Sequence, residues 1–240
     1  MELVIAHIHP ELLNLYGDSG NIITLKARLS ARGIDAKIIE YGIEDSLDFS
    51  STDIIYIGGG TDREQLTSCK KLCSFKAEFK SYSEDGGTIL AVAAGYPLLG
   101  QYYEQNSEKI EALGLLDMYT EQGDDRTIGN VILESDLIGT TIVGFENHSG
   151  RTYINNHTPL GKVLYGNGNN GEDKTEGVIY KNTFATYLHG PLLPKNAELC
   201  DEILKRALKR KYGEEIALEP LDDAAEDAAL NYVINRFIKE

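Results

Sequence analysis

Short apolar runs alternate with longer amphipathic segments over the first hundred residues. The apolar runs cover residues 2–8, 35–41, 53–60 and 87–95, and the amphipathic segments cover residues 21–33 and 61–86. Apolar residues at helical spacing indicate helices, whereas short continuous apolar runs bounded by turn residues indicate buried strands. Strands that alternate with helices form βαβ units. This half of the chain therefore predicts an open, mainly parallel α/β sheet flanked by helices.

The middle of the chain has a different pattern. Short β-type runs, separated by Gly, Asn and Asp, cover residues 127–135, 140–154 and 161–190. They predict an antiparallel extension or hairpins at the edge of the sheet. The stretch GNGNNGEDKTEG (166–177) predicts an exposed surface loop within this part.

Two helical patterns, at residues 195–213 and 224–239, finish the chain. A length of 240 residues is typical of one large domain with at most a small appendage. We therefore expect a single domain over residues 1–240, with a core at 1–213 and a helical tail at 214–240.

Charge and cysteine content limit the partners and the compartment. The formal net charge is -15, and nucleic acids and anionic membranes are bound by clustered Lys and Arg, so we expect neither partner. The first twenty residues lack the segments of a signal peptide, and no apolar run approaches the roughly 20 residues that cross a bilayer. Three cysteines make no paired framework. These features predict a cytoplasmic protein that is not embedded in a membrane.

Two turns follow strands of the predicted parallel sheet, where ligands of such sheets bind. The first, GGGTDREQ (58–65), brings backbone N–H groups close to a ligand. Neither phosphate-binding glycine motif is present. Phosphate and the oxyanion of an acyl-transfer intermediate both remain candidate ligands.

The second turn lies in LAVAAGYPLLG (90–100), which has the pattern of a strand, a tight turn and a helix. Several enzyme families mount a nucleophile on such a turn, but here Ala93 occupies the place of a Cys or Ser. His189, in TYLHGPLL (186–193), follows a β-type run and precedes Gly-Pro, which predicts a position at the rim of the sheet. A nucleophile turn, a glycine turn and a rim histidine are the components of acyl-transfer catalysis.

In this order, GGGTDREQ, LAVAAGYPLLG and YLHG resemble the class I (triad) glutamine amidotransferases of the cobyric acid synthase type. The elbow of those enzymes reads approximately L-A-[IV]-C-[GA]-G-Y-Q-[LF]-L-G. HPELLNLYGDSGNIITLKAR, RTIGNVIL and GFENHSGRT further resemble the glutaminase subunit of lipid II isoglutaminyl synthase. The resemblance covers about residues 1 to 200.

The resemblance implies a role for each matching residue. Ala93 takes the position of the nucleophilic cysteine, and His189 that of the general base and acid. The oxyanion hole would use the backbone N–H of Gly59 or Gly60 and that of Ala94. Arg126 matches the family's glutamine-binding arginine, whose guanidinium suits the α-carboxylate of the substrate.

The resemblance also implies the reaction and its partners. The family hydrolyses glutamine to glutamate and ammonia, and an ATP-dependent, Mur-ligase-like partner uses the ammonia to amidate D-glutamate of lipid II in peptidoglycan synthesis. The glutaminase itself needs no metal and no nucleotide cofactor. A non-catalytic glutamine-binding or structural subunit of the ligase is the alternative, as is a cobyric-acid-type enzyme with another ammonia acceptor.

Three departures from the family pattern affect this expectation. A methyl group cannot attack a carbonyl, so the chain with Ala93 is expected to be inactive. Pro191 stands where many relatives carry the glutamate that orients the histidine, and in the resembled branch the partner supplies an acid instead. Pro97 replaces a frequent glutamine. An engineered Cys→Ala change is the favoured explanation of Ala93, and a natural pseudo-glutaminase is the other.

Overall fold

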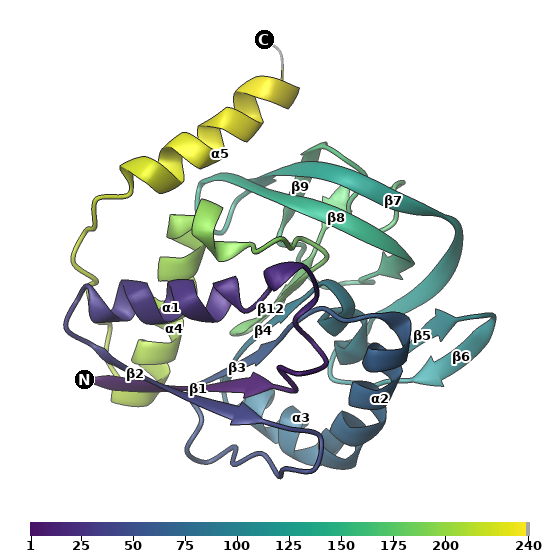
Figure 1. Ribbon diagram of the computed structural model, residues 1–240, viewed down its shortest axis with the longest axis horizontal. Helices are drawn as coiled ribbons and strands as arrows, with labels where there is room; N and C mark the ends of the chain where they lie inside the picture. The colour runs from purple at the N-terminus through teal and green to yellow at the C-terminus, as the bar shows by residue number, and fades with distance from the viewer. Residues whose placement is uncertain (239–240) are drawn as a thin grey trace.

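The computed structural model describes residues 1–238 and is built around a six-stranded sheet (Figure 1). The strand order is β11-β12-β4-β3-β1-β2, and all neighbours are parallel except β11 and β12. The strands are β1 (Glu2–Ile8), β2 (Asp35–Tyr41), β3 (Ile54–Ile57), β4 (Thr88–Val92), β11 (Val178–Tyr180) and β12 (Thr183–Thr186). The predicted α/β class with a mainly parallel sheet is confirmed.

Helices cover both faces of this sheet because its strands are apolar on both sides. In β1, Leu3 and Ile5 belong to a buried cluster on one face of the sheet. Ala6 and Ile8 belong to a second buried cluster on the other face. The helices of the first face are α1 (Gly20–Ser30) and α4 (Ala197–Tyr212), and those of the second are α2 (Asp62–Leu72) and α3 (Lys76–Glu84). A 3-10 turn at Cys73–Phe75 divides the helical pattern predicted over 61–86 into α2 and α3.

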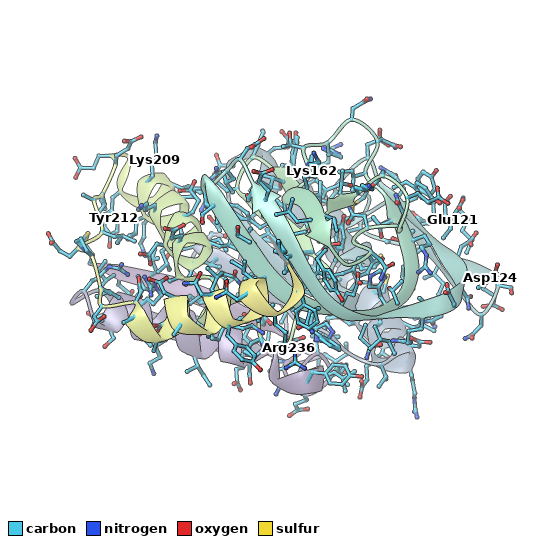
Figure 2. All side chains as sticks on the ribbon, turned by 90° about the horizontal axis from the view of Figure 1, so that it is seen from above. Glu121, Asp124, Lys162, Lys209, Tyr212 and Arg236 are labelled. Atoms are coloured by element: carbon cyan, nitrogen blue, oxygen red, sulfur yellow. The ribbon has the colours of Figure 1, made fainter. Side chains whose placement is uncertain are left out.

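The β-rich middle of the chain forms a second sheet of its own, drawn in teal in Figure 1. Its order is β10-β9-β7-β5-β6, and β8 pairs with β7. The strands are β5 (Tyr102–Gln105), β6 (Glu108–Glu111), β7 (Tyr119–Ser135), β8 (Thr140–Tyr153), β9 (Gly161–Tyr165) and β10 (Thr175–Glu176). Figure 2 places Glu121 and Asp124 of β7 at the opposite end of the molecule from Lys209 and Tyr212 of α4.

The structure corrects in part the prediction of a surface loop over residues 166–177. Residues 166, 167 and 171–174 are exposed, but Asn169, Asn170 and Glu176 are buried. Glu146 of β8 accepts hydrogen bonds from the N–H groups of Asn167 and Gly168, both at 3.0 Å. A glycine- and asparagine-rich sequence is typical of exposed loops, but here its polar groups bond to a buried carboxylate and are drawn into the second sheet.

The C-terminal part follows the predicted helices. Buried Arg28 of α1 pairs with Asp201 of α4 and with Asp223, the residue before α5 (Ala224–Phe237), and so ties the final helix to the core. Residue 239, the expected end of that helix, lies outside the described residues. Within residues 1–238, no helix combines the length and the apolarity that a membrane span requires.

Candidate active site

The carboxyl ends of three neighbouring parallel strands create the candidate site. In the order β12-β4-β3, the strands are followed by His189, by Ala93 and Ala94, and by Gly59 and Gly60. The second sheet contributes Arg126 from β7. All six predicted site residues line one cavity of about 580 Å³. The sequence motifs, which are up to 130 residues apart, therefore meet in space.

Ala93 has the strained backbone of a nucleophile elbow. Its φ is +50°, a left-handed conformation that side-chain-bearing residues rarely adopt. Its methyl group faces the glycine turn, because a Cβ built on Gly59 would lie 2.8 Å from the Cβ of Ala93. The turn thus presents residue 93 to the cavity, with a methyl group where a thiol would be needed for attack.

The predicted helix after the elbow does not form. Two short 3-10 turns, η3 (Ala93–Gly95) and η4 (Pro97–Leu99), lead directly into the second sheet. Pro97 has no N–H to give an α-helical bond to the Ala93 carbonyl, which accepts the Tyr96 N–H instead, at 3.1 Å. These turns therefore give residue 93 no α-helix dipole.

The two candidate oxyanion donors of the glycine turn are not equivalent. The Gly59 N–H already donates a hydrogen bond to Oδ2 of Asp18, at 3.1 Å. The Gly60 N–H has no acceptor within the part of the chain that the structure describes. The Ala94 nitrogen lies 3.6 Å from the position of a Cβ on Gly59, so it also faces this turn. Gly60 and Ala94 are thus the donors that remain free for an oxyanion.

Asp18 supports the site from outside the cavity lining; its segment YGDSGN (16–21) predicts either a helix cap, by Asp18 or Ser19, or a role at the rim of the site. Neither Asp18 nor Ser19 caps α1 through its side chain. Instead, the fully buried Asp18 carboxylate accepts N–H groups from Gly59 and, at 3.4 Å, from Gly190. Burial raises the pKa of Asp18 to about 6, although both hydrogen bonds act in the opposite direction. One carboxylate therefore ties the glycine turn to the histidine turn.

His189 is buried and neutral at pH 7. Burial, together with the nearby His148 and Lys195, lowers its pKa to about 4. The backbone N–H of His189 donates to the Phe145 carbonyl at 3.0 Å, and this bond fixes the turn against β8. The ring atom Nδ1 is buried without a hydrogen-bond partner among residues 1–238. An imidazole that acts as a general base normally has an acid at this atom.

Pro191 explains why no acid follows the histidine along the chain. It stands two residues after His189 and packs against α1, where a Cβ on Gly20 would lie 2.5 Å from its Cγ. No carboxylate is among the groups that shift the pKa of His189. The imidazole therefore has the place of a triad histidine, but residues 1–238 supply no orienting acid to it.

Arg126 is aimed at the cavity by a β-bulge. The register of β7 against β8 shifts between Gln122 and Thr127, and such bulges re-aim side chains. Nη1 of Arg126 donates to the carbonyl of Asn147 at 3.0 Å and to its Oδ1 at 2.8 Å. The remaining guanidinium N–H groups have no acceptor among residues 1–238 and stay available to a carboxylate.

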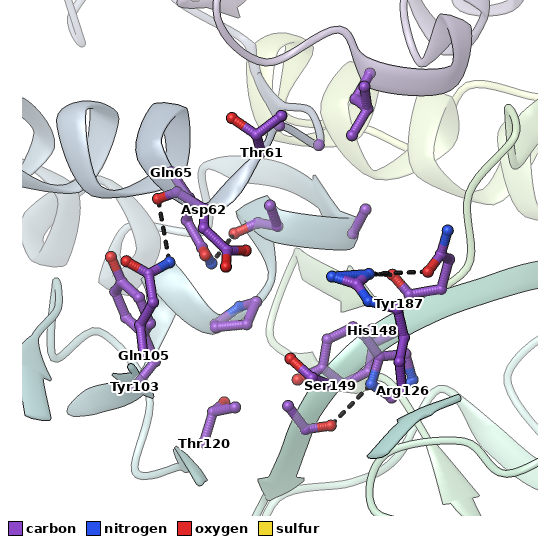
Figure 3. A pocket seen from close by; sticks show the side chains of 18 of the residues that line it. Thr61, Asp62, Gln65, Tyr103, Gln105, Thr120, Arg126, His148, Ser149 and Tyr187 are labelled. Atoms are coloured by element: carbon purple, nitrogen blue, oxygen red, sulfur yellow. Dashed lines mark hydrogen bonds between the residues drawn. The ribbon is translucent and has the colours of Figure 1, made fainter. Parts of the chain in front are cut away.

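Figure 3 shows the two walls of the cavity. Arg126, His148, Ser149 and Tyr187 lie along one wall, and Asp62, Gln65, Tyr103 and Gln105 lie along the other. His148 stacks on Tyr187 with ring centroids 3.6 Å apart, and its Nδ1 is 2.8 Å from the Gly150 carbonyl. These contacts hold His148 in the wall. Within residues 1–238, no three His, Cys, Asp or Glu side chains converge in a way that could hold a metal ion.

The chain matches known proteins over most of its length. The model of the CobB/CobQ-like glutamine amidotransferase domain matches residues 4–197. The GatD subunit of lipid II isoglutaminyl synthase (glutamine-hydrolyzing) from Staphylococcus aureus (strain N315) is 46% identical, over 98% of this chain and 96% of the relative. The GatD subunit from Streptococcus pneumoniae (strain ATCC BAA-255 / R6) is 41% identical, over 92% of this chain and 86% of the relative.

More distant relatives and solved structures agree on the fold. A probable cobyric acid synthase from Methanocaldococcus jannaschii is 30% identical over 75% of this chain, which covers 38% of that longer protein. A glutamine amidotransferase crystal structure superposes with a TM-score of 0.58 at 17% identity, over 84% of this chain and 98% of its own. The glutaminase domain of Trypanosoma brucei CTPS with bound acivicin superposes with a TM-score of 0.55 at 10% identity, over 90% of this chain and 96% of its own. The chain therefore belongs to the CobB/CobQ-like glutamine amidotransferases, a family of glutamine-hydrolysing enzymes.

Proposed function

We propose that this protein is the glutaminase subunit of a two-protein amidotransferase, with Ala93 in place of the nucleophilic cysteine. The observation that carries the proposal is the convergence of Ala93, His189 and Arg126 on one cavity at the ends of adjacent strands. The identity to GatD subunits over nearly the whole chain supports it.

If residue 93 carried a thiol, each of these groups would have a role in the reaction. His189 would take the thiol proton, and the sulfur would attack the side-chain amide carbon of glutamine. The N–H groups of Gly60 and Ala94 would stabilise the oxyanion of the tetrahedral intermediate. His189 would then protonate the leaving nitrogen, which departs as ammonia, and water would release glutamate from the thioester. Arg126 would hold the α-carboxylate of the substrate.

With Ala93 the same cavity can bind glutamine but cannot form the thioester. Removal of a triad nucleophile eliminates covalent catalysis and leaves binding and electrostatic stabilisation. We therefore expect the chain as given to be inactive and to bind intact glutamine.

The unpartnered Nδ1 of His189 supports dependence on a second protein. An orienting acid at this atom would fix the tautomer of the imidazole and stabilise its protonated form, and residues 1–238 supply none. We propose that an ATP-dependent, Mur-ligase-like subunit supplies the acid, receives the ammonia and amidates the α-carboxyl of D-glutamate in lipid II. The complex would act in the cytoplasm, on precursor at the inner face of the membrane.

One observation favours a second function. The methyl group of Ala93 is compatible with a subunit that binds glutamine without hydrolysing it and completes the ligase structurally. The matched cobyric acid synthase also keeps open another ammonia acceptor on the same glutaminase scaffold.

Calorimetry of the chain as given with glutamine tests the proposed site. We expect saturable binding of glutamine without ammonia release, and at least tenfold weaker binding by Arg126→Ala, because a charge-assisted contact to a carboxylate contributes about 1.5–3 kcal/mol. Equal affinity of the two proteins would remove Arg126 from the site, and the absence of binding by the parent chain would refute the proposed function.

A further inference from the structure

Tyr16 connects two parts of the site that have separate roles. Its ring stacks on the imidazole of His189, with centroids 5.1 Å apart and an interplanar angle of 25°. Its hydroxyl accepts a hydrogen bond from Nδ2 of Asn147 at 3.1 Å. The Oδ1 atom of the same Asn147 accepts Nη1 of Arg126 at 2.8 Å. A single side chain thus touches the imidazole and, through one amide, the guanidinium.

The loop that carries Tyr16 is held in place at both ends. The Leu15 N–H donates to the Gly59 carbonyl at 2.9 Å, and the Asp18 carboxylate accepts the Gly59 N–H at 3.1 Å. Between these anchors the backbone is left-handed, with φ of +60° at Tyr16 and +75° at Gly17. An aromatic residue rarely adopts this conformation, and such strain concentrates at functional sites.

Packing into the core does not account for the position of Tyr16. Its side chain is 57% exposed, so little apolar surface is buried to offset the strained backbone. What the conformation achieves is contact with His189 and Asn147 at the mouth of the cavity.

We propose that Tyr16 is a positioning residue for glutamine hydrolysis: its ring fixes the His189 imidazole and shields it from water, and its hydroxyl holds Asn147 and thereby Arg126. The inference rests on the proposed function. It divides the side chain into two parts, of which the ring serves the general base and the hydroxyl serves the binding of the substrate carboxylate.

The surroundings of His189 support the role of the ring. The imidazole is enclosed by the Tyr16 ring on one side and by the edge of Phe145, with centroids 5.7 Å apart. The charged and titratable groups that act on its pKa are His148 from β8 and Lys195 from the turn after Pro191, while the Asp18 carboxylate is bound to the backbone of the neighbouring Gly190. Removal of the ring would admit water to the imidazole and favour its protonated form.

Two substitutions in the chain as given separate the two parts of Tyr16. Tyr16→Phe keeps the ring and removes the hydroxyl, whereas Tyr16→Ala removes both. Tyr232→Ala is the matched control, because Tyr232 is 63% exposed, does not line the cavity, and has a hydroxyl that accepts a hydrogen bond from Arg236 of the same helix, α5. The titration of His189 is followed by NMR with ¹³C-labelled histidine, assigned from a His189→Gln sample, and glutamine affinity is measured by calorimetry.

For Tyr16→Phe we expect an unchanged His189 titration and a three- to tenfold weaker affinity for glutamine, the effect of about one neutral hydrogen bond. For Tyr16→Ala we expect the same or a larger loss of affinity and a His189 midpoint raised by about one pH unit or more. Tyr232→Ala should change neither. An unchanged affinity in Tyr16→Phe, or an unchanged titration in Tyr16→Ala, would overturn the inference. If the parent chain itself binds no glutamine, the proposed function fails, while the titration still tests the role of the ring.

Discussion

Oδ2 of Asp18 accepts the N–H of Gly59 at 3.1 Å, and this bond joins the loop before α1 to the turn after β3. The other oxygen of the same carboxylate accepts the Gly190 N–H, beside His189. The bond at Gly59 also leaves Gly60 as the free donor of the glycine turn. A buried carboxylate therefore sets the relative positions of the two turns on which the proposed chemistry depends.

Asp18 should make stability depend on pH in a defined direction. Its pKa is about 6 in the folded protein and ordinarily 3.8, so the folded state binds the proton more tightly. The stability contributed by this group is complete below pH 3.8 and is lost as the pH rises through about 6. Relative to Asp18→Asn, which cannot titrate, the free energy of unfolding of the parent should fall by about 1–3 kcal/mol between pH 4 and pH 7.

Urea unfolding of both proteins at pH 4, 5.5 and 7 measures this difference. Neutral Asn can accept only one of the two N–H groups, so the variant also carries a pH-independent loss, which cancels in the comparison across pH. A difference that stays constant from pH 4 to pH 7 would show that Asp18 does not titrate in this range.

Gly59 should tolerate no side chain. A Cβ at this position would lie 2.8 Å from the Cβ of Ala93 and 2.8 Å from Oδ2 of Asp18, closer than side-chain carbons approach other atoms. We expect Gly59→Ala to lower the free energy of unfolding by about 1–3 kcal/mol and to abolish measurable glutamine binding. Gly129→Ala in β7 is the control, because no atom lies within 4 Å of its Cβ position. Similar losses in the two variants would contradict the close approach at Gly59.

Replacement of Ala93 by glycine should destabilise the protein less than replacement of a nearby alanine in the strand. A left-handed φ costs an L-residue about 1–2 kcal/mol, and glycine avoids this cost while losing about 0.5–1 kcal/mol of unfolded-chain entropy. Ala93→Gly should therefore be neutral or stabilising by up to about 1 kcal/mol. Ala91→Gly, in the buried extended part of β4, should cost about 1–2 kcal/mol. Thermal unfolding of both variants measures these changes in stability. Equal destabilisation by the two substitutions would exclude strain at residue 93.

Glu176 gives a second pH-dependent prediction, in the segment that was expected to be an exposed loop. Its Oε1 accepts the Thr186 hydroxyl and the Tyr187 N–H, while Oε2 is buried without a partner among residues 1–238. Burial raises its pKa to about 7, so the charged form is disfavoured and its stability contribution is lost as the pH rises from about 4.5 through 7.

Glu176→Gln should therefore be more stable than the parent at pH 8, by about 1–3 kcal/mol, and nearly equal to it at pH 5. Guanidinium unfolding at the two pH values measures the change. Glu172→Gln, in the exposed part of the same segment, is the control. If the stability difference between Glu176→Gln and the parent were the same at pH 8 as at pH 5, the raised pKa of Glu176 would be contradicted.

The fold and the outline of the site could be predicted because they depend on local patterns. Apolar runs alternating with helical segments predict the parallel sheet, and the ends of its strands predict where Ala93, Gly60 and His189 meet. Arg126 and His189 follow from their motifs. Each of these residues lines the cavity.

What could not be predicted depends on partners that are distant in the sequence. Asp18 has the local signature of a helix cap, but its carboxylate bonds to residues 41 and 172 positions away. Residues 166–177 have a loop composition, but Glu146 of β8 holds them. The elbow lacks a following helix because Pro97 cannot donate the required hydrogen bond. Tyr16 gave no signal of its contact with His189, since stacking across a cavity has no periodic pattern.

The release of ammonia from glutamine tests most directly whether this is a glutaminase scaffold without its nucleophile. The Ala93→Cys protein and the protein with Ala93 are each purified with a Mur-ligase-like partner, the proposed source of the acid that His189 lacks, and ammonia is measured with glutamine alone. We expect turnover by Ala93→Cys and none by the chain with Ala93. If neither protein releases ammonia although both bind glutamine, the site lacks more than the sulfur, and the protein is a glutamine-binding subunit.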